Sequence, residues 1–261
     1  ADCFIVDNST QPKLREGLQE LCTRTGACFL DMGGNVGLGS AQNAGIRAAR
    51  SKGYRYVLFM DDDSMPDRLM LSKLQDELAK QEQVFGVAIV TPVVKNVFSA
   101  VGRESIAAGG TTIRCDRAKL MSSGTLTPLK LFDLIGPLDE ILFVDYVDYE
   151  LGWRAQAAGI PKFVVHDAIL AHSIGEGDLN FLGLKLRTPS PIRHYFQFRN
   201  TFILWRRRSV PMTWKISRAL VLPIKFLLLY VLTGFSRERL TYAMLGIKHG
   251  LNNVGGPFKL K

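Results

Sequence analysis

The chain has 261 residues, 47% of them hydrophobic and 22% charged, a composition that excludes disordered and fibrous proteins and can bury one large core or two modest ones. Its net charge of +9 is unevenly distributed: residues 185–261 contain 15 Lys and Arg and one acidic residue, whereas residues 1–184 contain the remaining 18 basic and 23 acidic residues. The C-terminal part, with a net charge of +14, is therefore expected to bind a polyanion, either nucleic acid or anionic lipid headgroups.

The cysteines show no pattern of a disulfide framework or a metal site. Cys3, Cys22, Cys28 and Cys115 include no C-x-x-C pair and no spacing typical of metal ligands. We interpret them as reduced thiols of a cytosolic protein. No signal peptide opens the chain.

The first half of the chain alternates apolar runs with helical patterns, which predicts an open α/β sheet with mostly parallel strands. Such sheets bind ligands at the carboxyl ends of their strands, so Asp7, the glycine-rich loop and the acidic triplet are expected at one binding edge. Strands are expected at residues 3–7, 27–32, 54–60 and 84–94, and helices at 12–25, from the glycine-rich loop through 52, and at 65–80.

The second half is less regular. Residues 95–134 mix glycine pairs with Ser and Thr, which is typical of a flexible flap or a β-excursion. A helix is expected to start near Asp148, and two short strands are expected within residues 162–177. The run 219–235 contains Pro223 and Lys225, which makes it a poor spanning helix, because spanning takes about 20 apolar residues.

Three aspartates, Asp61, Asp62 and Asp63, stand directly behind an apolar run. Like charges repel, and a cation among them would explain the crowding. Alternate residues at a strand end point to the same side, so Asp61 and Asp63 are expected to face one ligand while Asp62 turns away. Carboxylates without thiolates suit Mg²⁺ or Mn²⁺ shared with substrate phosphates. The alternative is an acidic helix N-terminus, which the macrodipole favours.

The glycine-rich loop, GNVGLGSAQNAGI, contains Gly37 and Gly39 but has Gln42 where a dinucleotide fingerprint needs its third glycine. A dinucleotide-dependent oxidoreductase is therefore only an alternative hypothesis. The amides Asn35 and Asn43 stand beside the glycines and suit sugar hydroxyls and phosphates. A plain helix-entry turn is the other interpretation of this loop.

Two acids and one histidine complete the candidate site. Asp148 and Glu150 flank a helix start, and Asp148 is interpreted as a general base with Glu150 in reserve. An N-cap is the structural alternative for Asp148. His172 follows an apolar strand and is interpreted as either a third metal ligand or a structural histidine.

The segments VDNST, NVGLGSAQNAGI, VLFMDDDSMP, FVDYVDYELGWRA and ILAHS resemble, in order and spacing, the motif set of family 2 glycosyltransferases over residues 3 to about 205. Within that family the chain looks most like bacterial rhamnosyltransferases, with galactofuranosyltransferases next. The resemblance implies a GT-A fold and an inverting transfer of a sugar from a nucleotide diphosphate donor. It also implies that an opening strand and helix, roughly 30 residues, are missing from the front.

The resemblance and the chemistry of the residues together suggest a role for each candidate residue. Asp61 and Asp63 match the family's D-x-D and would hold Mg²⁺ or Mn²⁺ together with His172. Asp148 matches the general base, and Glu150 would orient acceptor hydroxyls. The residues that would bind the donor nucleotide sugar are Asp7, Asn35, Gly37, Asn43, Asp61 and Asp62.

These inferences divide the chain into a GT-A domain, residues 1–184, and a basic, helical, membrane-associating segment, residues 185–261. The bases and aromatics around the run 219–235 suit a helix in the headgroup layer, and a buried core helix is the alternative. The expected partners are dTDP-rhamnose or a UDP-sugar, a glycan or lipid-linked glycan acceptor, and an anionic membrane. The protein is expected on the cytoplasmic face of the cell membrane, in envelope polysaccharide synthesis. Nucleic acid is not expected, because no binding motif is recognisable.

Overall fold

The computed structural model describes residues 2–96, 112–115, 121–172, 179–181, 184–186 and 188–258. The helices are α1 (Pro12–Thr25), α2 (Leu38–Ser51), α3 (Met70–Phe85), α4 (Lys130–Ile135), α5 (Val147–Ala157), α6 (Pro191–Trp205), α7 (Met212–Leu232) and α8 (Arg237–Leu251), with a 3₁₀ helix at Glu140–Leu142. The strands are β1 (Phe4–Asp7), β2 (Cys28–Asp31), β3 (Tyr56–Leu58), β4 (Ser64–Pro66), β5 (Ile89–Asn96), β6 (Thr112–Arg114), β7 (Leu126–Pro128), β8 (Lys162–His172), β9 (Leu179–Phe181) and β10 (Leu184–Leu186).

The main sheet has the strand order β3-β7-β5-β8-β4, and β6 pairs with β8 outside this path. Strands β5 and β8 run parallel, whereas β3–β7, β5–β7, β4–β8 and β6–β8 are antiparallel. Strands β1 and β2 form a separate parallel pair, and β9 and β10 an antiparallel pair. The predicted α/β fold is confirmed, but the sheet is mixed and not mostly parallel, because β4, from the loop after the acidic triplet, and β6 and β7, from the expected flap or β-excursion, all pair antiparallel.

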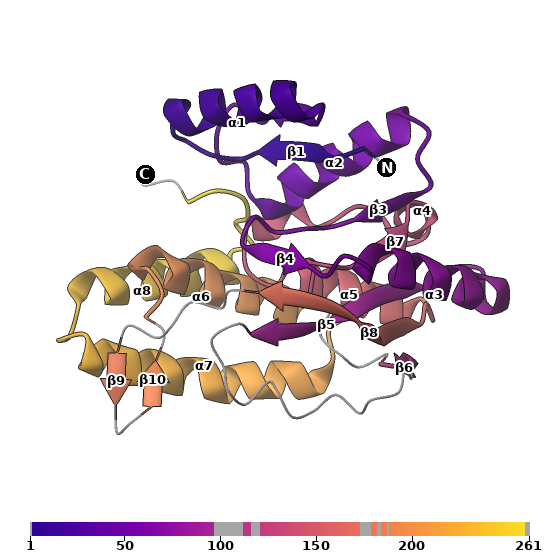
Figure 1. Ribbon diagram of the computed structural model, residues 1–261. Coiled ribbons are helices and arrows are strands. Elements are labelled where there is room, and N and C mark those ends of the chain that lie inside the picture. The colour runs from indigo at the N-terminus through magenta and orange to yellow at the C-terminus, as the bar shows by residue number, and fades with distance from the viewer. Residues whose placement is uncertain are drawn as a thin grey trace.

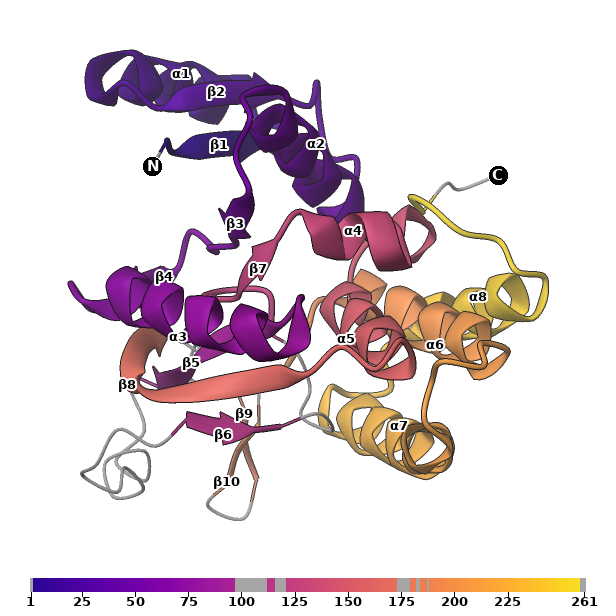
Figure 2. The same cartoon turned by 90° about the vertical axis from the view of Figure 1, so that its right-hand side faces the viewer.

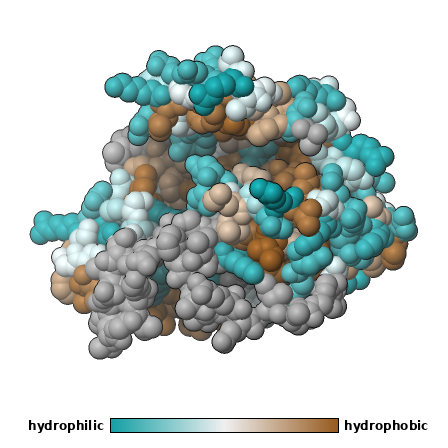
Figure 3. Space-filling view, viewed as in Figure 1, coloured by the Kyte–Doolittle hydropathy of each residue, from teal (hydrophilic) through white to brown (hydrophobic). Residues whose placement is uncertain are grey.

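The N-terminal elements form a layer of their own. Helices α1 and α2 lie with β1 and β2 above the main sheet in Figure 1. In the same orientation, Figure 3 shows a hollow between this upper layer and the lower part of the molecule, with apolar residues inside it. All four cysteines are free thiols.

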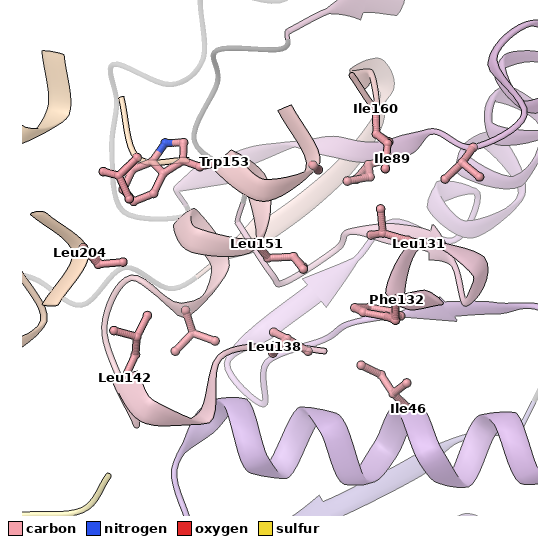
Figure 4. Close-up of a cluster of buried hydrophobic side chains, with 14 of the residues drawn as sticks. Ile46, Ile89, Leu131, Phe132, Leu138, Leu142, Leu151, Trp153, Ile160 and Leu204 are labelled. Atoms are coloured by element: carbon pink, nitrogen blue, oxygen red, sulfur yellow. The ribbon is translucent and has the colours of Figure 1, made fainter. Parts of the chain in front are cut away.

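Helices cover both faces of the main sheet. Side chains alternate along β5, so Ile89 belongs to one buried cluster and its neighbour Val90 to another. The Val90 cluster includes Met70 of α3, which packs on β5, β7 and β8. The Ile89 cluster, drawn in Figure 4, joins α4 and α5 to Ile46 of α2 and Leu204 of α6. This second cluster fixes α5, on which Asp148 stands, against α2 and α6.

Three elements differ from the sequence prediction. The helix expected from residue 65 begins at Met70, because β4 pairs with β8 before it. The two short strands expected within 162–177 are one strand, β8, whose register against β5 shifts between Pro92 and Val93. The segment expected to be a flexible flap or a β-excursion contains β6 and β7, and β7 inserts between β3 and β5, a pairing that the sequence did not predict. The rest of that flap, residues 97–111 and 116–120, lies outside the described residues.

The basic C-terminal residues contribute α6, α7 and α8. Helix α6 belongs to the core: Arg199 and Asn200 are both fully buried, and the Arg199 Nη2 donates to the carbonyl of Leu142 at 2.7 Å. Helix α8 packs along α6, and α7 lies at the edge of the molecule farthest from α1 (Figure 2). The domain boundary at residue 184 stays a prediction.

Candidate active site

The acidic triplet lies in the turn that connects β3 to β4. The loop before β7 anchors this turn: the Asp61 N–H donates to the Ser123 Oγ at 3.1 Å, and the Ser123 hydroxyl donates to the Ser64 Oγ at 2.8 Å. Asp61 is partly buried, whereas Asp62 and Asp63 are exposed. Ser123 therefore holds the backbone of this turn in place, and the turn carries its carboxylates at the edge of the sheet.

The fold brings His172 beside this turn. His172 is the last residue of β8, and its backbone pairs with Ser64 of β4. Because Ser64 directly follows Asp63, the histidine stands next to the acidic triplet although the two are distant in sequence. Its side chain lies outside the described part of the structure, so its role as a metal ligand stays a prediction.

Asp148 stands in the first turn of α5, behind a loop with an unusual backbone. Phe143, Asp145 and Tyr146 have φ values of 64°, 57° and 70°, a region that residues other than glycine rarely adopt. The side-chain amide of Asn200 on α6 donates to three carbonyls of this loop, at 2.6 to 3.1 Å. Because strained backbone persists only where its surroundings hold it, α6 is the support that positions Asp148.

The pKa of Asp148 is raised to about 6, chiefly by burial and also by the negative charges of Asp61 and Asp145. A hydrogen bond from the Tyr149 N–H, at 2.9 Å, opposes this rise. The influence of Asp61 means that the acidic turn and Asp148 lie within electrostatic reach of each other. A carboxylate with a pKa near 6 is mostly ionised at neutral pH and is a stronger base than an ordinary aspartate.

The burial of Asp148 has a structural cause. The residue lines a cavity of about 10 Å³, and most of the other lining side chains are apolar, among them Phe59, Leu138 and Leu151. A cavity of this size has room for about one water molecule. The carboxylate is therefore poorly hydrated on its inner side, which disfavours the charged form and raises the pKa.

Glu150 does not share this environment. Its side chain is 1% exposed, and both carboxylate oxygens lie 2.8 Å from the Nε of Arg154. Arg207 Nη1 adds a third contact, at 3.1 Å from the Glu150 Oε1. A carboxylate occupied by two guanidinium groups cannot orient acceptor hydroxyls. The role predicted for Glu150 is therefore corrected: it is a buried ion-pair partner that ties α5 to the segment between α6 and α7.

The glycine-rich loop packs against the loop that precedes α5. The Leu38 N–H donates to the Phe143 carbonyl at 2.6 Å, and a Cβ at Gly37 would lie 2.6 Å from the Phe143 ring. Asn43 is buried, and its side-chain amide bonds to both the N–H and the carbonyl of Leu138, at 3.0 and 2.9 Å. Gly37 and Asn43 therefore anchor α2 to the chain before α5, and the donor contacts predicted for them stay predictions.

Gly37→Ala is expected to destabilise the protein more than Gly33→Ala, by about 2 kcal/mol. Both glycines have positive φ, 91° and 72°, so alanine strains the backbone at either position. Only at Gly37 does the new methyl group collide with Phe143, whereas nothing lies within 4 Å of it at Gly33. Urea unfolding of both variants measures the difference. Equal free energies of unfolding would contradict the packing role of Gly37.

Asn35 differs from Asn43 because it is exposed. Its side-chain oxygen accepts hydrogen bonds from the Gly37 N–H at 3.0 Å and the Asn8 side-chain amide at 3.3 Å. The Asn8 Oδ1 accepts in turn from the Val36 N–H at 2.8 Å. The two amides thus link the carboxyl end of β1 to the glycine-rich loop, and the donor contact of Asn35 stays a prediction.

Asp7 and Asp31 end the paired strands β1 and β2 and are register partners. The Nε of Arg15 lies 3.4 Å from the Asp7 Oδ2 and 3.2 Å from the Asp31 Oδ1. Burial acts to raise the pKa of Asp7, but hydrogen bonds from Ser9 and Arg15 outweigh it and lower the pKa. Asp7 is therefore a fixed anion, and its contact with the nucleotide base stays a prediction. Arg15, one turn into α1, was not identified from sequence.

The residues of the triplet fit a metal that is shared with a substrate. Within the described ranges, no three or more His, Cys, Asp or Glu side chains are grouped so that they could hold a metal ion by themselves. Mg²⁺ is usually bound by one or two carboxylates together with substrate phosphates and water, not by a cage of protein ligands. The two oxygen-donor side chains of Asp61 and Asp63 match that arrangement.

Comparison with known proteins shows which proteins the chain resembles. Residues 1–126 match the model for glycosyl transferase family 2. The chain is 27% identical to the dTDP-rhamnosyl transferase RfbF of Shigella flexneri, in a match that covers 98% of this chain and 88% of that protein. Both findings exclude the alternative of a dinucleotide-dependent oxidoreductase.

Solved structures of glycosyltransferases share the fold. TarS 1–349 of S. aureus in complex with UDP-GlcNAc matches with a TM-score of 0.55 and 13% identity over 97% of this chain and 72% of that chain. GalNAc-T7 with UDP, GalNAc and Mn²⁺ matches with a TM-score of 0.53 and 12% identity over 84% of this chain and about half, 48%, of that chain. The chain is therefore a glycosyltransferase with a GT-A fold, similar to family 2 over residues 1–126 and to a bacterial dTDP-rhamnosyl transferase over nearly its whole length.

Proposed function

We propose that the enzyme transfers rhamnose from dTDP-rhamnose to a hydroxyl group of a glycan acceptor, with inversion of the anomeric centre, in the synthesis of a cell-envelope polysaccharide. The observation that carries the proposal is the proximity of the acidic turn to Asp148: this residue shares a cavity with Phe59 and Ser122, which stand close in sequence to Asp61 and to Ser123, and the charge of Asp61 adds to the rise of its pKa. Sugar transfer needs these two parts, a site for the leaving diphosphate and a base for the acceptor. Similarity to the Shigella flexneri dTDP-rhamnosyl transferase supports rhamnose as the sugar.

On the donor side, Asp61 and Asp63 would hold Mg²⁺ or Mn²⁺, with His172 as a third ligand. Such a cation neutralises the negative charge that develops on the leaving diphosphate. The Mn²⁺ in the structure of GalNAc-T7 with UDP supports a divalent metal in this role. Asp7, Asn35 and Asp62 would contact the nucleotide around it, and the hydrogen bonds that Ser123 makes keep the turn in place before the donor arrives.

On the acceptor side, Asp148 would accept the proton of the acceptor hydroxyl as its oxygen attacks the sugar. With a pKa of about 6, the carboxylate is ionised at neutral pH and still basic enough to share the proton in the transition state. One base on the face opposite the leaving group is sufficient for inversion, and no nucleophilic side chain is required. The loop held by Asn200 would orient this base.

The test is a comparison of donors with the purified chain. Thermal unfolding is measured with dTDP-rhamnose, UDP-galactofuranose and UDP-GlcNAc, each with Mn²⁺ and with EDTA, and release of free nucleotide is followed in parallel. We expect dTDP-rhamnose with Mn²⁺ to stabilise the fold, by about 2.7 kcal/mol at a concentration about 100 times Kd. A response to UDP-galactofuranose alone would identify a galactofuranosyltransferase, and no response to any donor would contradict the proposal.

A further inference from the structure

Helix α7 is apolar on two opposite sides. Its inner side packs on the active-site elements: the Trp214 ring lies 4.9 Å from the Trp153 ring and 5.3 Å from the Tyr146 ring, between centroids. Its outer side carries large apolar residues spaced three or four apart, which places them on one face of the helix. These residues, called the outer stripe below, are Met212, Ile216, Leu220, Ile224, Leu227 and Val231, each between 47% and 68% exposed.

The surroundings of the outer stripe are cationic and aromatic. The stripe contains no charged residue, and exposed cations stand before it, at Arg208, and after it, at Arg237. Trp205 and Phe235, 41% and 60% exposed, stand near the two ends of the helix. An uncharged apolar face of this length between cations and aromatic rings is typical of a helix that lies in a membrane interface.

We propose that α7 docks the enzyme on an anionic bilayer, with the outer stripe at the boundary of the acyl chains and the flanking cations on lipid phosphates. In the part of the chain that the structure describes, no helix has the length and apolar character needed to cross a membrane, which fits a helix that lies on the surface. A second copy of the chain is a poorer occupant, because each copy would bring the net charge of +14 of residues 185–261 to the contact.

This docking has a consequence for the acceptor. Tyr146, which contacts Trp214 of α7, stands two residues before Asp148. The proposed base therefore stands on the helix whose first residues follow the contact with the inner side of α7. A glycan anchored in the inner leaflet of the cell membrane could present its hydroxyl there. This consequence rests on the proposed function, whereas the docking itself does not.

The docking is tested by co-sedimentation of the full chain with vesicles of phosphatidylcholine alone and of phosphatidylcholine with phosphatidylglycerol. The variant Leu220→Glu with Ile224→Glu places two charges in the outer stripe. Its matched control, Leu14→Glu with Val84→Glu, places the same charges at exposed apolar positions of α1 and α3, 53% and 72% exposed. We expect the unchanged protein and the control to bind anionic vesicles, and the stripe variant to bind at least roughly tenfold more weakly.

Three outcomes would overturn the proposal. Equal binding of the stripe variant and the unchanged protein would show that α7 does not mediate docking, provided that both unfold at the same temperature. Failure of the unchanged protein to bind either kind of vesicle would exclude the bilayer. A dimer in light scattering that the stripe variant dissociates, without vesicle binding, would identify a second copy as the occupant. Vesicle binding by Asp148→Asn, which is expected to lose transfer, separates this proposal from the proposed function.

Discussion

Asp148→Asn is expected to abolish sugar transfer and leave the fold intact. If Asp148 accepts the proton of the acceptor hydroxyl, removing its basicity should lower kcat by about 10²- to 10⁴-fold. The measurement is turnover of dTDP-rhamnose with an acceptor, at several pH values. For the unchanged enzyme, kcat/KM should fall about tenfold per pH unit below about pH 6, because the proton that binds Asp148 there removes the base.

The same substitution should stabilise the protein at neutral pH. The folded-state pKa of Asp148, about 6, lies above the ordinary value of about 3.9, so the folded state binds the proton more tightly than the unfolded state. Burying the ionised carboxylate therefore lowers the free energy of unfolding. This loss is absent below about pH 4, grows as pH rises, and is complete above about pH 6. Asparagine removes that cost, by up to about 3 kcal/mol. Loss of activity together with a higher Tm at pH 7.5 is the expected signature of a functional acid.

Glu150→Gln provides the contrast. Glu150 is more deeply buried than Asp148 and stands two residues away, but two arginines neutralise it. Its replacement removes the negative charge that Arg154 and Arg207 share, but both arginines are partly exposed and Arg207 keeps its ion pair with Asp139, so the expected cost is roughly 2 kcal/mol of stability. Retained transfer in Asp148→Asn, or a large loss of stability in that variant, would contradict the assignment of Asp148 as the base.

The two carboxylate positions were visible in the sequence because their local context is sufficient. An apolar run followed at once by Asp61, Asp62 and Asp63 predicts a strand end with crowded charges. Asp148 likewise precedes a helical pattern after an aromatic segment. In both cases the chain neighbours predict a strand end or a helix start, whereas the hydrogen bonds that hold the backbone there, from Ser123 and Asn200, come from distant segments.

The role of the glycine-rich loop was ambiguous in the sequence for a physical reason. Glycine and asparagine are required wherever a backbone must approach another surface closely, and that surface can be a ligand or the protein itself. In this chain, Gly37 and Asn43 approach Phe143 and Leu138, about 100 residues later in sequence. Nothing in the local pattern distinguishes these two cases, because the partner is set by tertiary contacts.

The same limit explains the other differences. Glu150 was expected to face an acceptor because it sits at a helix start, but its partner Arg207 comes from beyond α6. Strand β7 was hidden in a segment rich in glycine and serine, and only pairing with β3 and β5 makes it a strand. Asn200, which holds the loop before Asp148, lies in a basic helix that the sequence associated with the membrane.

Asp63→Asn and Asp61→Asn are each expected to lower transfer by about 10²-fold or more and to remove the Mn²⁺-dependent stabilisation by the donor. Each substitution takes away one of the two carboxylates proposed to hold the cation at the diphosphate, so charge on the leaving group is less well stabilised. Asp76→Asn, an exposed aspartate on α3, is the control for the loss of one charge. Donor-dependent stabilisation that persists in both site variants would contradict the metal assignment.

The two substitutions should differ in their effect on the base. The charge of Asp61 is among the leading causes that raise the pKa of Asp148 and that of Asp63 is not, so Asp61→Asn should lower this pKa more than Asp63→Asn in the metal-free protein. An NMR titration of the Asp148 carboxyl carbon, without metal, measures this directly. An unchanged pKa in Asp61→Asn would mean that the acidic turn and the base do not share one cleft. A lowered pKa would tie the donor and acceptor sides together, since a single carboxylate would then act on both.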